Sequence, residues 1–176
     1  MDFKKRIQMK NIAIIPARSG SKGLKDKNIK LLNGIPLIEY SIDAAISANI
    51  FDEVMVSTDS DMYAEIAKKC GASVPFLRSK VNSTDKASSW DVVLEVLNYY
   101  QKKDQKFDIF CLLQPTSPLR KAEDILSAYS IFNEKRAKAV VSVGEVEHSP
   151  LWCNVLDKDN SLENFLSSDR MKQRQE

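Results

Sequence analysis

The sequence predicts an α/β fold in which helices cover both faces of a doubly wound, mostly parallel sheet. Short apolar runs alternate along the chain with stretches in which apolar residues recur at helical spacing. None of the runs alternates cleanly between polar and apolar residues, which is typical of parallel strands buried on both faces. Strand and helix in regular alternation indicate right-handed crossovers between parallel strands.

Five apolar runs are expected to form the strands. They are residues 12–15, 54–56, 74–77, 109–113 and 139–143. In doubly wound sheets, ligands bind beyond the carboxyl ends of the strands, where the strand order reverses. A functional site is therefore expected in the loops that directly follow these strands.

The stretches between the runs have apolar helical faces. In chain order these faces comprise Leu37, Ile38, Ile42, Ala45 and Ile46; Met62, Ile66, Ala67 and Cys70; Val93, Val96, Leu97 and Tyr100; and Ile125, Leu126, Tyr129 and Phe132. Ser60 is the expected N-cap of the second helix, and Gly71 its stop signal. Glu123 and Asp124 fall in the first turn of the fourth helix, where the helix dipole favours negative charge.

Composition excludes several classes of protein. The chain has 176 residues, with 26 Lys and Arg against 24 Asp and Glu, which gives a formal net charge of +2. This near-balance argues against a protein that coats nucleic acid or a membrane surface. Three scattered cysteines favour a reducing compartment and offer no zinc site. No apolar run approaches the roughly 18 residues of a membrane span, so we expect the protein in the cytoplasm.

The loop after the first strand, residues 16–28, is rich in cations and glycines. It holds one arginine, three lysines and two glycines. Glycines allow backbone amides to turn toward an anion, and fixed cations add charge for phosphate oxygens. The Walker A pattern and the GxGxxG dinucleotide pattern are both absent. The loop is interpreted as a phosphate site, and a solvated basic turn is the alternative.

Polar loops also follow the second and third expected strands. In residues 57–61, Ser-Thr-Asp-Ser-Asp, the last two residues are interpreted as helix caps, and Asp59 is left open between capping and binding of a ribose hydroxyl or a metal. Arg78 follows the third run, and the serines of residues 83–89 precede a helix. A cation, hydroxyls and a helix dipole near one point suit a nucleotide. A plain capping stretch with a surface arginine is the alternative.

The loop after the fourth strand, residues 112–120, reads Leu-Leu-Gln-Pro-Thr-Ser-Pro-Leu-Arg. Gln114 ends a buried strand and is fixed by two prolines, so its amide can read the edge of a base. Arg120 opens the next helix against the helix dipole, and we expect it to contact an acidic side chain or a phosphate. The single histidine, His148, supports no Ser/His/Asp triad.

Four segments, IIPARSGSKGLKDKN, VSTDS, TDKASS and LLQPTSPLR, resemble the acylneuraminate cytidylyltransferase (CMP-sialic acid synthetase) family, which includes legionaminic and pseudaminic acid cytidylyltransferases. The resemblance covers residues 10–176. It implies a Rossmann-like fold of the nucleotide-diphospho-sugar transferase type with a C-terminal dimerisation extension. The implied reaction transfers CMP from CTP to the anomeric hydroxyl of a nine-carbon keto sugar acid, a nonulosonic acid, and releases pyrophosphate.

The resemblance also implies roles for single residues. The triphosphate and nucleotide are expected to be bound by Arg18, Lys22, Lys27 and Asn28. The cytosine and ribose are expected to be surrounded by Arg78, Ser89 and Gln114. The sugar site is expected to contain Gln114 and Arg174. Arg18, Lys27 and Arg174 are the expected catalytic residues. In-line attack on an α-phosphate needs charge neutralisation and alignment more than an acid–base pair. The loops supply such cations, and the nucleophile would be the sugar's own hydroxyl.

The sequence departs from the family at its end. Family members continue with an RxNGAIYI-like strand and a DIDxxxD-like segment, and neither is present. The aspartates of the second segment hold Mg²⁺ in the family, so Mg²⁺ is expected as the cofactor, but no metal ligand is identified in this sequence. We therefore expect either a chain that is truncated relative to the family or a degenerate copy of a family member. In both cases we expect it to bind nucleotide yet turn over poorly or not at all.

Residues 1–144 are expected to form the nucleotide-binding α/β domain, and residues 145–176 the start of a dimerisation and sugar-site extension. Apolar residues in the extension lack helical periodicity and need a surface to cover. The resemblance implies a homodimer in which Arg174 serves the partner's active site.

Two other functions stay open. A 3-deoxy-manno-octulosonate cytidylyltransferase shares the fold and an IPAR-type loop, although GSKGLKDKN and LLQPTSPLR favour the neuraminate branch. A non-catalytic nucleotide-binding module or inactive fragment is the rival from another class. An NAD-dependent oxidoreductase is disfavoured because the first loop lacks the dinucleotide glycine spacing.

Overall fold

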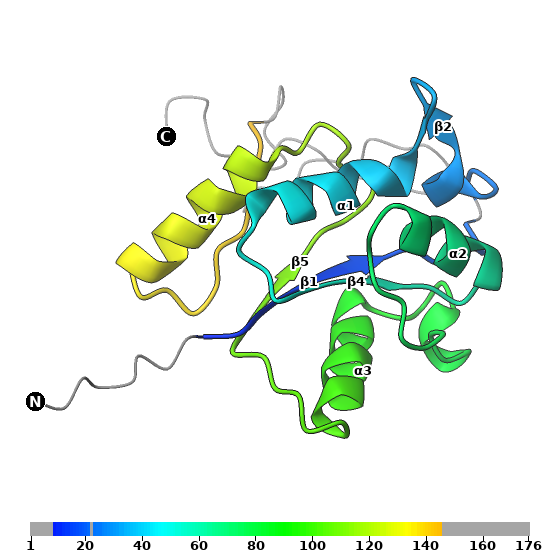
Figure 1. Ribbon diagram of the computed structural model, residues 1–176. Coiled ribbons are helices and arrows are strands. Elements are labelled where there is room, and N and C mark those ends of the chain that lie inside the picture. Colours follow the sequence, from blue (N-terminus) through cyan, green and yellow to red (C-terminus); the bar gives the residue numbers. More distant parts are fainter. Residues whose placement is uncertain (1–8, 22, 146–176) are drawn as a thin grey trace, which may run out of the picture. The chain divides into compact units, whose positions relative to one another are not determined.

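The computed structural model describes residues 9–21 and 23–145. By its internal contacts the chain divides into two compact units, residues 1–140 and 141–176, and the elements below belong to the first. A parallel sheet is built from β1 (Asn11–Pro16), β4 (Glu53–Ser57) and β5 (Ile109–Leu112), in the order β4-β1-β5 (Figure 1). The central strand β1 pairs Ala13 with Val54 of β4 and Cys111 of β5.

The two faces of β1 pack against different helices, as a doubly wound sheet requires. Ala13 and Ile15 belong to one buried cluster with side chains from α1 (Leu37–Ala48), α2 (Asp61–Lys69) and α4 (Ala122–Glu134). Ile12 and Ile14 point to the other face and pack against Val93 and Val96 of α3 (Ser89–Gln101). Figure 1 shows α1 and α4 on one side of the sheet and α3 on the other. The predicted α/β class is confirmed, because apolar residues on both faces bury residues 12–15 of β1 completely.

Two of the helices, α2 and α3, begin at side-chain caps that the sequence supplies. The Ser60 hydroxyl accepts a hydrogen bond from the backbone amide of Tyr63, and Gly71 follows α2 with φ at +91°, so the predicted cap and stop signal are both confirmed. Ser88 and Asp91 form a reciprocal capping box at the start of α3. Asn49 closes α1 in the left-handed conformation.

Short elements connect the first loop to α1. They are the 3₁₀ turn η1 (Lys27–Ile29) and the antiparallel pair β2 (Leu31–Leu32) and β3 (Ile35–Pro36), and a second 3₁₀ turn, η2 (Val81–Ser83), precedes α3. No helix in the described part of the chain is both long and apolar enough to cross a membrane.

Two of the five predicted strands are wrong. In the third run only the preceding Ser73 forms a bridge, to Met55, and residues 74–77 are irregular. Pro75 lacks the backbone amide that a strand there would need. Residues 139–143 form no strand either, and Val141 and Val143 are 78% and 91% exposed.

The helical faces also differ in detail from those expected. Ile46, Met62 and Leu126 are exposed, whereas Tyr63 in α2 is completely buried. The helix errors arise because apolar spacing alone does not show how a helix is rotated against its sheet.

Candidate active site

A cavity of about 430 Å³ opens beyond the carboxyl ends of β1 and β5. The first loop forms one wall, and the start of α3 and the loop after β5 form the rest. Five of the residues predicted from the sequence line it: Arg18, Lys27, Asn28, Ser89 and Gln114. The N-terminus of α3 also borders the cavity and adds the partial positive charge of its helix dipole. The cavity thus gathers positive charge at the ligand edge of the sheet, as predicted.

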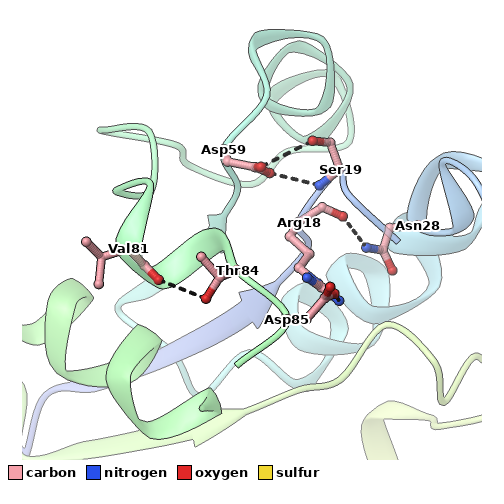
Figure 2. A network of polar contacts seen from close by, with 7 residues as sticks. All are labelled: Arg18, Ser19, Asn28, Asp59, Val81, Thr84 and Asp85. Atoms are coloured by element: carbon pink, nitrogen blue, oxygen red, sulfur yellow. Dashed lines mark hydrogen bonds and ion pairs between the residues drawn. The ribbon is translucent and has the colours of Figure 1, made fainter. Parts of the chain in front are cut away.

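Side chains from other elements hold the backbone of the first loop. The Asn28 amide nitrogen donates to the carbonyl oxygen of Arg18 at 3.1 Å, and the backbone amide of Ser19 donates to a carboxylate oxygen of Asp59 at 2.8 Å (Figure 2). The Ser19 hydroxyl donates to the second Asp59 oxygen at 3.2 Å. Asp59 therefore anchors the first loop. These two hydrogen bonds account for the position of its carboxylate without a capping contact or a contact with a ribose hydroxyl.

The side chain of Arg18 forms an ion pair with Asp85. Its Nη2 atom lies 2.6 Å from the Asp85 carboxylate, and the two side chains are 29% and 36% exposed. Asp85 follows η2 in a turn where the Thr84 hydroxyl donates to the carbonyl of Val81 at 3.2 Å (Figure 2). A cation that lines the cavity is thus joined to a carboxylate from a distant part of the chain.

Lys27 follows a turn that is fixed to α2. The preceding residue, Asp26, adopts the left-handed conformation with φ at 53°, and its carboxylate accepts a hydrogen bond from the Tyr63 hydroxyl at 3.2 Å. Burial, with the neighbouring Asp26 carboxylate, raises the pKa of Tyr63 to about 12. Tyr63 therefore stays a neutral donor to Asp26 at ordinary pH.

Arg78 is buried, with 7% of its surface exposed, and it is not among the described residues that line the cavity. Its Nε donates to the Ser57 hydroxyl at 2.9 Å, and its Nη2 to the Ser57 carbonyl. Burial lowers the pKa of Arg78 to about 10, and the nearby Asp59 carboxylate opposes that shift. Arg78 stays charged at neutral pH and ties the end of β4 to the segment after residue 77, so the alternative of a surface arginine is wrong.

Gln114 lines the same cavity and lies beside Ser89. Its Nε2 donates to the Ser89 hydroxyl at 3.3 Å, and its backbone carbonyl accepts from Arg120 Nη2 at 3.0 Å. Arg120 also donates to the Ser41 hydroxyl at 3.3 Å. Among the described residues no acidic side chain is hydrogen-bonded to Arg120, although the Asp124 carboxylate opposes the lowering of its pKa by burial. Contact of Arg120 with a phosphate stays a prediction. Arg120 precedes α4, which begins at Ala122, and braces the loop that carries Gln114.

Sequence reasoning missed several residues of this site. Asp85, the Asp26–Tyr63 pair and Ser41 were not singled out, because each acts through a partner far away in the sequence. The only signal for Asp85 is that it lies in the TDKASS segment, residues 84–89, which resembles the family. Lys22 and Arg174 lie outside the described residues. Within the described part of the chain, no three His, Cys, Asp or Glu side chains come together as metal ligands do.

A parallel α/β sheet with a cationic cavity at its carboxyl edge defines a protein of the nucleotide-binding α/β class. The chain belongs to the cytidylyltransferase family, whose model matches residues 12–176.

Characterised proteins with similar sequences carry related names. The chain is 44% identical to the CMP-N,N'-diacetyllegionaminic acid synthase of Legionella pneumophila over 88% of its own length and 66% of the relative's. It is 42% identical to an N-acylneuraminate cytidylyltransferase of Streptococcus agalactiae, over 96% and 40% of the two lengths. It is 40% identical to a pseudaminic acid cytidylyltransferase of Campylobacter jejuni, over 89% and 68%. The chain spans less than two thirds of the first two relatives.

Solved structures share the fold at lower identity. A CMP:2-keto-3-deoxy-manno-octonic acid synthetase complexed with CTP matches with a TM-score of 0.61 and 24% identity, over 73% of this chain and 49% of that one. A 4-diphosphocytidyl-2C-methyl-D-erythritol synthase from Anaerococcus prevotii matches with a TM-score of 0.60 and 18% identity, over 88% and 63%. These likenesses support the α/β fold.

Proposed function

We propose that the chain carries the CTP-binding site of an enzyme that transfers CMP to the anomeric hydroxyl of a nonulosonic acid and releases pyrophosphate. The observation that carries this proposal is that one cavity is lined by two kinds of group. Arg18 and Lys27 supply fixed positive charge, and the Gln114 amide and Ser89 hydroxyl supply hydrogen-bonding groups. A nucleoside triphosphate calls for both, because it has anionic phosphates at one end and a base at the other.

In the proposed reaction, the anomeric oxygen of the sugar acid attacks the α-phosphorus of CTP. A new P–O bond forms as the hydroxyl proton passes to solvent, the bond between the α-phosphorus and the bridging oxygen breaks, and its electron pair leaves with pyrophosphate. Arg18 and Lys27 would offset the charge that gathers on the phosphate oxygens, which is the main requirement of phosphoryl chemistry. The Asp59 and Asn28 contacts fix the loop that carries these cations before the nucleotide arrives.

The sugar acid is proposed from the names of the relatives, which are legionaminic, acylneuraminic and pseudaminic acid enzymes. We further propose that Mg²⁺ accompanies CTP, since cations that bridge phosphate oxygens suit this chemistry. The described residues do not supply a set of ligands for it: Asp59 is bonded to Ser19 and Asp85 to Arg18. No step above depends on the metal.

The full protein is proposed to be a cytoplasmic homodimer in which Arg174 of each subunit reaches the partner's sugar site. The family resemblance supports this assembly, and the scattered cysteines support a reducing compartment. Arg174 itself lies outside the described residues.

Pyrophosphate release tests the proposed function. The longest natural form of the protein is incubated with CTP, Mg²⁺ and either N-acetylneuraminic, legionaminic or pseudaminic acid, and in parallel with 3-deoxy-manno-octulosonate. We expect pyrophosphate with a nine-carbon acid and little with the eight-carbon one. Release with the eight-carbon acid alone would assign the rival enzyme. CTP binding without release under any condition would assign a nucleotide-binding module or inactive fragment.

A further inference from the structure

We propose that the Asp85 carboxylate occupies, in the ligand-free protein, the place on Arg18 that a phosphate group takes when a polyphosphate binds. Asp85 would then compete with the nucleotide for Arg18, and the free energy needed to displace its carboxylate would lower the affinity for the nucleotide. The identity of the polyphosphate as CTP rests on the proposed function, but the competition itself does not.

The geometry of the ion pair supports this role. The 2.6 Å contact lies on a residue that lines the cavity, and both side chains keep roughly a third of their surface open to solvent. A guanidinium binds carboxylate and phosphate with the same N–H groups. A phosphate oxygen that reaches the Arg18 donor engaged by Asp85 must therefore replace the carboxylate or accept a like charge beside it.

The surroundings allow the side chain of Arg18 to change partners while its backbone stays fixed. Asn28 holds the Arg18 carbonyl, and Asp59 holds the amide of the next residue, Ser19 (Figure 2). Asp85 lies in an exposed turn held by short-range contacts such as that of Thr84 with Val81. Exposed ion pairs are weak, so the exchange costs little.

Calorimetric titration tests the competition, with CTP and inorganic triphosphate as probes and EDTA present. Asp85→Asn keeps the shape of the side chain and removes the charge. We expect it to bind both probes about two- to five-fold more tightly than the wild type, the range that an exposed ion pair spans. The matched control is Asp104→Asn, which removes one charge from an exposed residue just beyond the far end of α3. Asn suits the left-handed conformation of Asp104 at φ 58°, and we expect unchanged affinity.

A double-mutant cycle shows whether Asp85 acts through Arg18. In an Arg18→Gln background, we expect Asp85→Asn to change triphosphate affinity no more than the Asp104→Asn control does. An equal gain in both backgrounds would overturn the proposal, because it would reduce Asp85 to general repulsion. Weaker binding by Asp85→Asn would also overturn it, because Asp85 would then position Arg18 for its ligand.

The outcomes separate this proposal from the proposed function. CTP binding that Asp85→Asn leaves unchanged would overturn the competition alone. Tighter triphosphate binding by Asp85→Asn, with no preference for CTP over the other nucleoside triphosphates, would support the competition and contradict the proposed function. Failure of every variant and the wild type to bind either probe, both in EDTA and in a repeat with Mg²⁺, would overturn both.

Discussion

Arg18 owes its position to neighbours that the sequence does not place beside it. Its carbonyl is held by Asn28, and its guanidinium pairs with Asp85. The composition of the first loop predicted a phosphate site, because cations and glycines concentrated after one buried strand have few other uses. The ion pair with Asp85 could not be predicted, since the residues around Arg18 and around Asp85 in the sequence do not indicate that the two side chains meet.

We predict that Arg18→Ala weakens CTP binding by about 2 kcal/mol or more, the size of a lost charge-assisted contact. Isothermal titration with CTP measures the effect. Lys69→Ala, which removes an exposed cation in the last turn of α2, is the control and is expected to bind normally. Unchanged affinity in Arg18→Ala would contradict the phosphate-loop interpretation.

Gln114 is expected to set the choice of base. Its amide can accept from the cytosine amino group and donate to a ring acceptor, and its Nε2 is held by the Ser89 hydroxyl. Gln114→Glu loses the donor, so we expect CTP binding to weaken by about 1–3 kcal/mol and the gap between CTP and UTP to narrow. Competition titrations with both nucleotides measure the gap.

Gln105→Glu is the matched control for this change, because it introduces the same charge at an exposed position after α3. It should leave the preference for CTP intact. Equal discrimination by wild type and Gln114→Glu would show that Gln114 shapes the loop without reading the base.

At the scale of elements, apolar runs predicted the strands correctly where a neighbouring strand pairs with the run, and incorrectly where no such pairing forms. The runs at β1, β4 and β5 are confirmed, since each is bonded to an adjacent strand. Residues 74–77 have the right composition but contain Pro75, and residues 139–143 are apolar without forming a strand. Composition shows that a segment can be a strand, whereas hydrogen-bonding partners decide whether it is one.

The hydrogen bond that joins the first loop to α2 makes the stability of the protein depend on pH. The Tyr63 hydroxyl donates to Asp26, and its pKa rises from 10.0 to about 12 in the folded protein. A pKa raised by folding adds stability that is complete below pH 10 and is lost as the pH rises through about 12. The wild type should therefore lose unfolding free energy across this interval.

We predict that Tyr63→Phe lowers the free energy of unfolding at pH 7 by about 1–2 kcal/mol, since a part-buried hydrogen bond to a carboxylate is removed. From pH 10 to 12 its stability should fall less steeply than that of the wild type. Urea unfolding at each pH measures both. Tyr40→Phe, which removes an exposed contact with the Leu32 carbonyl, is the control and should follow the wild-type slope. Parallel curves for wild type and Tyr63→Phe would contradict the assignment.

At the scale of the whole molecule, the fold class could be predicted because every level of the sequence agrees on it. Side chains of β1 alternate between two buried clusters, and that requires helices on both faces. The assembly of subunits could not be predicted in the same way, because an apolar segment shows that a surface is needed without showing which one.

The homodimer with a shared site makes a sharp prediction of its own. Arg174→Ala chains and Arg18→Ala chains are prepared separately in the longest natural form of the protein, and each is expected to be inactive by itself. The two are then mixed in equal amounts until subunits exchange. If Arg174 acts on the partner's site, each mixed dimer has one site with both defects and one site with neither. Random exchange makes half of the dimers mixed, so about a quarter of wild-type pyrophosphate release should return. If Arg174 serves its own subunit, every site keeps one defect and mixing restores nothing. A mixture of either variant with itself is the control, and size-exclusion chromatography of differently tagged chains verifies that subunits have exchanged.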